Sequence, residues 1–162
     1  MRVYLSGGME YAEGEGVQWR VVMQEWIEKQ LQHSVFNPNV ESDKFFSTHH
    51  PNIDFRLMKK ENPQRYTEIV RKLVEIDCNE IVHRTNYVVC YWDDGAAKGA
   101  GTKGELTMAK FFNKPVYLVT QFELHDIPGW VLGCVTKTFP SFDELKKYLL
   151  TTHTHQKQDV RS

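Results

Sequence analysis

Residues 86–92 read Asn-Tyr-Val-Val-Cys-Tyr-Trp, a run of β-branched and aromatic side chains without a charged residue. Such a run is typical of a strand that is buried on both faces in the middle of a parallel sheet. A loop rich in glycine and alanine follows at residues 93–101, and residues 102–112 then show a helical pattern. A second apolar run occupies residues 116–120. A strand, a helix and another strand in this order predict a right-handed βαβ unit.

The same alternation continues toward both ends of the chain. We predict further strands at residues 3–5, 35–36 and 135–139, and further helices at residues 17–31, 63–81 and 141–150. Residues 39–62 are polar and irregular, so we expect a long loop or insertion with one short helix at most. Residues 151–162 are expected to form a polar, frayed tail. The sequence therefore predicts a single α/β domain over residues 1–150, with a Rossmann-like or flavodoxin-like parallel sheet covered by helices on both faces.

The composition is that of an ordinary globular domain. The chain has 162 residues, of which 41% are hydrophobic and 25% charged, which excludes a mainly disordered, collagen-like or coiled-coil protein. Its apolar runs are far shorter than the roughly 20 residues that span a bilayer, and we recognise no signal peptide, so we expect a cytoplasmic protein without a membrane partner. A net charge of −1 lacks the basic excess of a nucleic-acid-binding chain. Three widely spaced cysteines suit reduced core residues better than disulfides or a zinc site.

In open parallel sheets, ligands bind beyond the carboxyl ends of the strands. This rule directs attention to the loops after residues 5, 36 and 92, and to Glu105, which opens the helix behind the buried strand. Two interpretations of Glu105 are open. Thr102 and Glu105 match a capping box, in which the glutamate only closes its own helix. Alternatively, the free amides and dipole of the first turn keep Glu105 ionised as a nucleophile, with Gly101 and Gly104 leaving room for a ligand.

Three other groups are candidates for the same edge. Asp77 shares a helix face with apolar residues at positions 66, 70, 73 and 81, so it either lies at the solvent edge or points over the sheet. Asp93 and Asp94 directly follow the buried strand, although Asp-Asp-Gly is also common in turns. Ser6-Gly7-Gly8 either forms a tight turn or holds a sugar or phosphate through its backbone amides. The paired histidines His49 and His50, like His153 and His155, lack a third ligand at metal spacing, so we predict no metal site.

Several segments, taken in order, resemble the nucleoside 2-deoxyribosyltransferase family. They are the strand at residues 3–5 running into Ser6-Gly7-Gly8, Phe36-Asn37-Pro38, Asp77 within a helix, Val88-Val89-Cys90, Gly101-Thr102-x-x-Glu105, and Lys114-Pro115-Val116. The resemblance covers most of residues 1–120. It implies a Rossmann-like enzyme that cleaves N-glycosidic bonds without a cofactor, acts on a nucleoside or nucleotide and a free nucleobase, and forms a homo-oligomer in which a neighbouring chain completes the site.

The resemblance also implies roles for single residues. Glu105 would attack the anomeric carbon of a 2-deoxyribose, Asp77 would help to hold the sugar hydroxyls, and Tyr4 would lie beside the nucleophile. The expected substrate-binding residues are Ser6, Gly7, Gly8, Asp93, Gly101 and Thr102. Transferases of the family often carry an aspartate six residues before the nucleophile, where this chain has Gly99. We therefore assign assistance of the leaving base to Asp94 or to Asp93.

The loop after the first strand bears on the choice between nucleoside and nucleotide. Glu10, Glu13 and Glu15 would repel a 5′-phosphate and favour an uncharged nucleoside, whereas Lys98 and Lys103 keep the nucleotide possible.

Two other functions compete. The Gly99-x-Gly101-Thr102-x-x-Glu105 element also resembles lysine-decarboxylase-like phosphoribohydrolases, which release a base from a nucleoside monophosphate. The third possibility is a non-catalytic nucleotide-binding module on the same fold.

Overall fold

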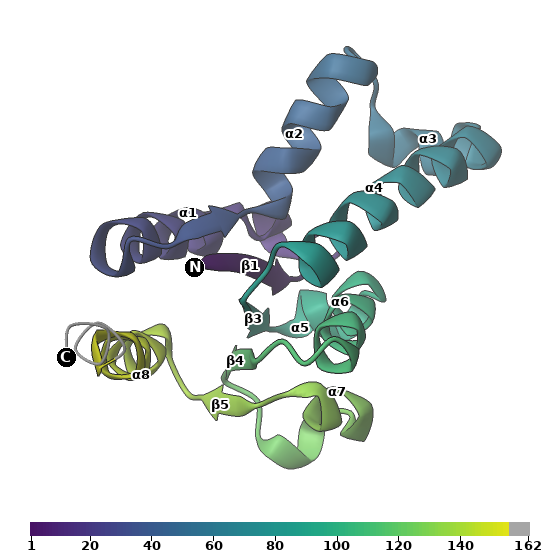
Figure 1. Ribbon diagram of the computed structural model, residues 1–162. Coiled ribbons are helices and arrows are strands. Elements are labelled where there is room, and N and C mark those ends of the chain that lie inside the picture. The colour runs from purple at the N-terminus through teal and green to yellow at the C-terminus, as the bar shows by residue number, and fades with distance from the viewer. Residues whose placement is uncertain (156–162) are drawn as a thin grey trace.

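The computed structural model describes residues 1–155, and within them five parallel strands form one sheet (Figure 1). Its strands are β1 (Arg2–Gly7), β2 (Ser34–Phe36), β3 (Tyr87–Trp92), β4 (Val116–Thr120) and β5 (Lys137–Phe139). They lie in the order β2-β1-β3-β4-β5, and each neighbouring pair is parallel. This is the flavodoxin-like order, in which the order of the strands reverses between β1 and β3. In such sheets ligands bind at that point, beyond the carboxyl ends of the strands. The predicted α/β fold is confirmed.

Helices cover both faces of the sheet. They are α1 (Val17–Trp26), α2 (Pro38–His49), α3 (Phe55–Glu61), α4 (Pro63–His83), α5 (Asp94–Lys98), α6 (Gly101–Phe111), α7 (Gly129–Cys134) and α8 (Phe142–His155). A π-helical turn (Ile27–Leu31) extends α1, and 3-10 turns occupy Glu13–Gly16 and Leu124–Asp126. One face packs against α1 and α8, and the other against α4, α6 and α7 (Figure 1). None of these helices is long and apolar enough to cross a membrane.

The alternation along β1 decides which side chains reach which face. Val3 and Leu5 belong to the core under α1 and α8, whereas Tyr4 belongs to the core under α4 and α6. Because side chains alternate along a strand, Ser6 lies on the same face as Tyr4. In register with this pair, Val88 lies opposite Tyr4 and Cys90 opposite Ser6 on β3. The hydroxyl groups of Tyr4 and Ser6 therefore lie one after the other along β1, on the sheet face that α4 and α6 cover.

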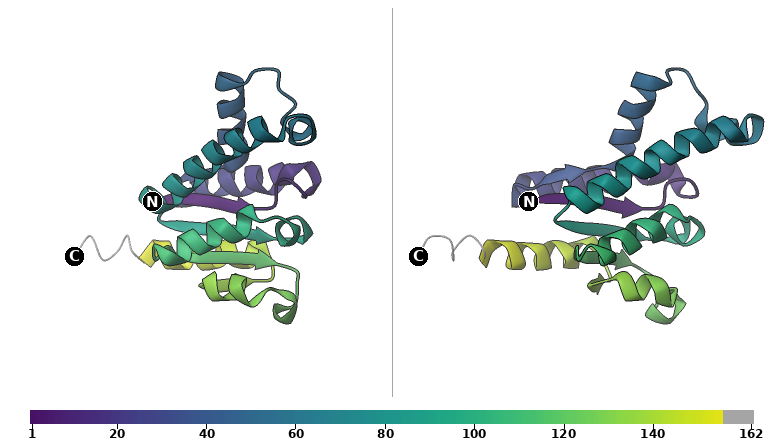
Figure 2. Two further views of the ribbon diagram at one scale, coloured as in Figure 1. Left: turned by 90° about the vertical axis from the view of Figure 1, so that its right-hand side faces the viewer. Right: turned by 45° about the vertical axis from the view of Figure 1, so that its right-hand side comes forward.

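The expectation of an irregular segment at residues 39–62 is wrong, because most of it forms α2 and α3. Side chains cap both helices: the Asn37 side chain accepts from the Asn39 amide at 3.2 Å, and that of Asp54 accepts from the Leu57 amide at 2.9 Å. These two helices stand out from the sheet beside the first half of α4 (Figure 2). Their packing is local, as in the ring contact between Phe46 and Phe55 at 4.8 Å, so no long apolar stripe marks them in the sequence.

Smaller differences concern the loops and the end of the chain. The predicted loop at residues 93–101 contains the short helix α5, and α7 lies where only a loop was expected before β5. Helix α8 continues to His155, past the predicted end at residue 150, so the expected tail is helical at residues 151–155. The rest of the predicted tail, residues 156–162, lies outside the described residues.

Candidate active site

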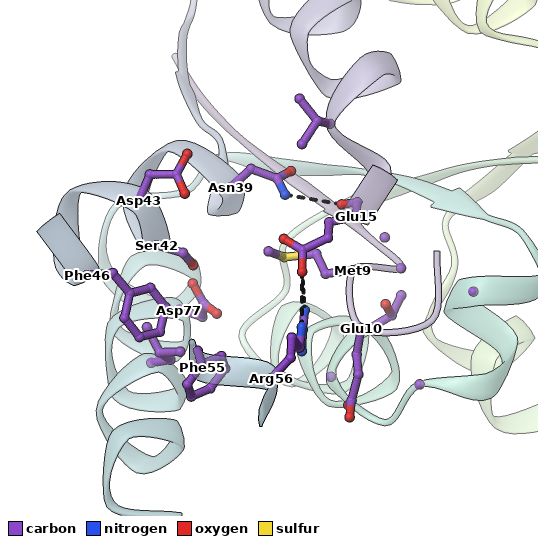
Figure 3. Close-up of a pocket in the computed structure, with 18 of the residues that line it drawn as sticks. Met9, Glu10, Glu15, Asn39, Ser42, Asp43, Phe46, Phe55, Arg56 and Asp77 are labelled. Atoms are coloured by element: carbon purple, nitrogen blue, oxygen red, sulfur yellow. Dashed lines mark hydrogen bonds and ion pairs between the residues drawn. The ribbon is translucent and has the colours of Figure 1, made fainter. Parts of the chain in front are cut away.

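A cavity of about 430 Å³ lies at the carboxyl end of β1 and beside the segment that follows β3. Figure 3 draws most of the residues that line it. Near β1 and the following loop it is lined by Gly7, Gly8, Met9, Glu10, Glu15 and Val17; in α2, α3 and their connection by Asn39, Ser42, Asp43, Phe46, Ile53, Asp54, Phe55 and Arg56; in α4 by Leu73 and Asp77; and around α5 and α6 by Gly95, Gly99, Ala100, Gly101, Thr102 and Glu105. Four separate parts of the chain thus close around one space.

Glu105 reaches back from α6 to β1. The Tyr4 hydroxyl donates to one carboxylate oxygen at 3.0 Å, and the Ser6 hydroxyl donates to the other at 2.5 Å. Helix α6 begins at Gly101 after Ala100, and no side chain caps this end. The capping-box interpretation is therefore wrong. Glu105 is instead held by two buried hydroxyl groups of β1 and presents its carboxylate to the cavity.

A second carboxylate, Asp77 of α4, faces the same space (Figure 3). Burial raises the pKa of Asp77 to about 8, and the nearby charge of Glu105 acts in the same direction. Burial also raises the pKa of Glu105, while the hydrogen bonds from Ser6 and Tyr4 and the positive charge of Arg20 oppose this rise. Two close carboxylates in a partly desolvated site share protons as a pair. Because Glu105 accepts the hydrogen bonds of both hydroxyl groups, the contacts favour the negative charge of the pair on Glu105 and its proton on Asp77.

Helix α3 is tied to the loop after β1 by charged pairs. The Arg56 guanidinium donates to one oxygen of Glu15 through Nε at 3.0 Å and Nη2 at 2.8 Å (Figure 3). Lys59 of the same helix donates to Glu10 at 2.5 Å. The Asn39 side chain of α2 donates to the Glu15 carbonyl at 3.1 Å. The α2 and α3 helices are thus attached to the opposite wall of the cavity at three points.

The structure brings most of the predicted site residues together. Tyr4, Ser6, Asp77 and Glu105 converge, and the glycines and threonine predicted to bind substrate line the cavity: Gly7, Gly8, Gly101 and Thr102.

The two aspartates after β3 are placed differently. The Asp93 carboxylate caps α5 by accepting from the Ala96 amide at 2.8 Å, and Asp94 is exposed in the first turn of that helix. Neither is among the cavity-lining residues, contrary to the leaving-group role predicted for them.

The sequence pattern does not mark several of the cavity residues. Asn39, Asp43, Phe46, Phe55 and Arg56 all lie in α2, α3 and the segment between them, which looked irregular and therefore offered no candidates. The proline after Asn37 and the aspartate before Phe55 were the available signals for two helix starts. Within the part of the chain that the structure describes, no group of His, Cys, Asp and Glu is arranged to hold a metal ion.

Comparison with known proteins places the fold. No protein-family model and no curated protein matches this sequence. Among solved structures, a 2-deoxyribosyltransferase from the psychrotolerant bacterium Bacillus psychrosaccharolyticus, described as a biocatalyst for nucleoside synthesis, is similar with a TM-score of 0.59. The similarity covers 90% of each chain, and 16% of the residues are identical. The chain therefore shares its fold with a 2-deoxyribosyltransferase over 90% of its length.

Proposed function

We propose that this chain is a nucleoside 2-deoxyribosyltransferase-like enzyme, which cleaves the N-glycosidic bond of a 2′-deoxynucleoside and passes the deoxyribose to another base or to water. The observation that carries the proposal is the Glu105 carboxylate, held by Tyr4 and Ser6 at the wall of a cavity that also contains Asp77. A charged carboxylate in a fixed position beside a protonated one is the arrangement that glycosyl transfer with retention requires.

The reaction takes two displacement steps. In the first, a Glu105 oxygen attacks C1′ of the sugar, the bond from C1′ to the base nitrogen breaks, and its electron pair leaves with the base. This gives a deoxyribosyl ester of Glu105. In the second, a nitrogen of another base, or water, attacks C1′ from the face that the first base vacated, and the carboxylate is released. The acceptor loses a proton as the new bond forms.

The two β1 hydroxyl groups act in both steps. They hold the carboxylate in one orientation, so that little freedom is lost when it attacks. In the second step they stabilise the charge that returns to the departing carboxylate.

Asp77 supplies hydrogen bonding and a proton. In its protonated form it gives its proton to the leaving base, and its other oxygen accepts a hydrogen bond from a sugar hydroxyl. The role as proton donor replaces the one predicted for Asp93 and Asp94, which are not among the residues that line the cavity.

The charge of the cavity favours an uncharged nucleoside over a 5′-monophosphate. Its described wall carries several carboxylates, including Glu10, Glu15 and Asp43, and Arg56 is its only Lys or Arg side chain. Arg56 is already paired with Glu15. A phosphate entering this space would meet more repulsion than attraction.

We also propose that residues 1–150 form the catalytic domain of a cytoplasmic homo-oligomer. The exposed side chains of Phe111 and Trp130 on α6 and α7 support association, because large apolar side chains that lie open on a surface favour contact with a partner. The three unpaired cysteines agree with a reducing compartment.

A substrate screen with a Glu105→Gln variant tests the proposal. Purified protein is incubated with 2′-deoxynucleosides and their 5′-monophosphates, each with and without a second base, and free and exchanged bases are separated by chromatography. We expect turnover of nucleosides by the wild type and at least about a 1000-fold loss in Glu105→Gln. The matched control is Glu144→Gln, which removes an exposed carboxylate on α8. Full activity in a folded Glu105→Gln protein, or no turnover by the wild type, would contradict the proposal. Turnover of monophosphates alone would favour a phosphoribohydrolase.

A further inference from the structure

Arg20 of α1 is a buried cation that is held by backbone carbonyl groups. Its exposed fraction is 0%, and no carboxylate of residues 1–155 forms an ion pair with it. Its guanidinium donates instead to backbone carbonyl groups: Leu5 at 3.2 Å, Gly7 at 2.8 Å, Gly8 at 3.3 Å, Glu15 at 3.2 Å and Gly16 at 3.2 Å. A charge is costly to bury, so a single arginine in this position calls for an explanation.

The first part of the explanation is the shape of the loop between β1 and α1. Gly14, Glu15 and Gly16 all have positive φ angles, of 53°, 53° and 66°. For Glu15 this backbone conformation is strained. The loop carries Gly7, Gly8 and Glu15 into the wall of the cavity, and the guanidinium holds the carbonyl groups at both of its ends. Gly16 lies so close that a Cβ atom there would be 2.7 Å from Arg20 Nη1.

The second part is the charge. Groups from four elements interact with Glu105: Tyr4 and Ser6 from β1, Asp77 and Cys78 from α4, Cys90 from β3 and Arg20 from α1. Burial raises the pKa of the Cys90 thiol well above its usual range, so this group is neutral. Asp77 disfavours a charge on Glu105, and the two hydroxyl groups favour it without carrying charge themselves. Arg20 supplies the positive charge beside this cluster, because its guanidinium contacts the carbonyl groups of Leu5 and Gly7 on either side of Ser6, whose hydroxyl donates to Glu105. The Asp93 carboxylate also acts on this guanidinium.

We propose that Arg20 is a positioning residue of the active site, whose guanidinium holds the β1–α1 loop in shape and supplies the positive charge behind the strand residues that hold Glu105. The inference rests on the proposed function and adds to the site a residue that lies on the opposite face of the sheet from the nucleophile. A neutral hydrogen-bond donor could hold the loop, but only a cation can both hold the loop and place a positive charge near the Glu105 carboxylate.

Two substitutions separate the two roles. Arg20→Gln removes the charge and most donors, whereas Arg20→Lys keeps the charge but offers three donors to five carbonyl groups. We expect Arg20→Gln to move the acid limb of the pH profile of kcat/KM for a deoxynucleoside up by about one pH unit. At a pH below this limb, kcat/KM should fall about tenfold. Arg20→Lys should leave the limb in place. Both variants should speed amide hydrogen exchange in residues 8–16. The control Arg71→Gln, an exposed position on α4, should change neither measurement.

The positions of the acid limbs in the variants decide whether Arg20 has this role. An acid limb of Arg20→Gln that coincides with that of the wild type overturns the proposal, as does a limb that Arg20→Lys moves equally far. If Arg20→Gln does not fold, Arg20→Lys must still keep the limb while loosening the loop. If the wild type releases no base, the proposed function fails, and the pKa of Glu105 is then followed by carbon NMR of labelled carboxyl groups. An upward shift in Arg20→Gln supports the positioning role, and no shift overturns it.

Discussion

Replacing Tyr4 by phenylalanine tests the nucleophile assignment with the least disturbance of the fold. The Tyr4 ring is fully buried and stacks on Phe36 with 5.2 Å between the ring centres, and phenylalanine keeps this contact. The substitution removes one group, the hydroxyl that donates to Glu105 at 3.0 Å. The carboxylate then retains Ser6 as its hydroxyl donor.

The size of the effect follows from the hydrogen bond that is lost. A hydrogen bond to a charged group contributes about 1.5–3 kcal/mol. The ionised form of Glu105 loses this stabilisation and the protonated form does not, so the pKa of Glu105 rises. At 1.36 kcal/mol per unit, the rise is about one to two units. Below the acid limb, kcat/KM should fall about 10- to 100-fold, and above the limb it should approach the wild-type value.

The assay is the pH dependence of base release from a deoxynucleoside, measured between pH 4 and pH 9 for both proteins. Tyr87→Phe is the matched control, because Tyr87 is a buried tyrosine of the same sheet whose hydroxyl is hydrogen-bonded to His33 at 3.0 Å. This control should retain the wild-type profile. A Tyr4→Phe profile that is lowered equally at every pH, or that is not lowered at all, would refute the assignment of Glu105 as an ionised nucleophile held by this hydroxyl.

Two further predictions concern charges around the same cavity. Burial raises the pKa of Asp77 from 3.8 to about 8, so between these pH values the folded protein binds a proton that the unfolded chain has lost. The stability of the folded protein should therefore fall as pH rises through this window. Calorimetry should show a flatter dependence of Tm on pH in Asp77→Asn. Glu15→Gln should release Arg56 from its ion pair and raise kcat/KM for a 5′-monophosphate about tenfold relative to the nucleoside, measured by chromatography. Because this pair is well exposed it contributes at most about 1 kcal/mol, so Tm should change little, and an unchanged substrate ratio would show that Arg56 does not select between the two substrates.

The central part of the fold was predictable because its signals are local and strong. The run at residues 86–92 carries no charge, and this is the pattern of a strand covered on both faces, which β3 is. The α2 and α3 helices were not predictable from the same kind of signal. Their aromatic side chains, such as Phe46 and Phe55, pack on one another beside α4 and do not form a periodic face toward the sheet. The cavity residues in these helices could not be identified for the same reason.

Glu105 shows a different limit of sequence reasoning. Its spacing from Thr102 satisfies a local rule for closing a helix, and a local rule cannot weigh a partner about 100 positions away in the chain. The deciding information lies in the alternation of side chains along β1, where Tyr4 and Ser6 are two residues apart and therefore share a face. A shift of β1 by one residue would present Val3 and Leu5 to α6 instead and would leave Glu105 buried without donors. The environment of the nucleophile thus depends on the pairing register of β1 with β3, in which Ser6 lies opposite Cys90, as much as on the glutamate itself.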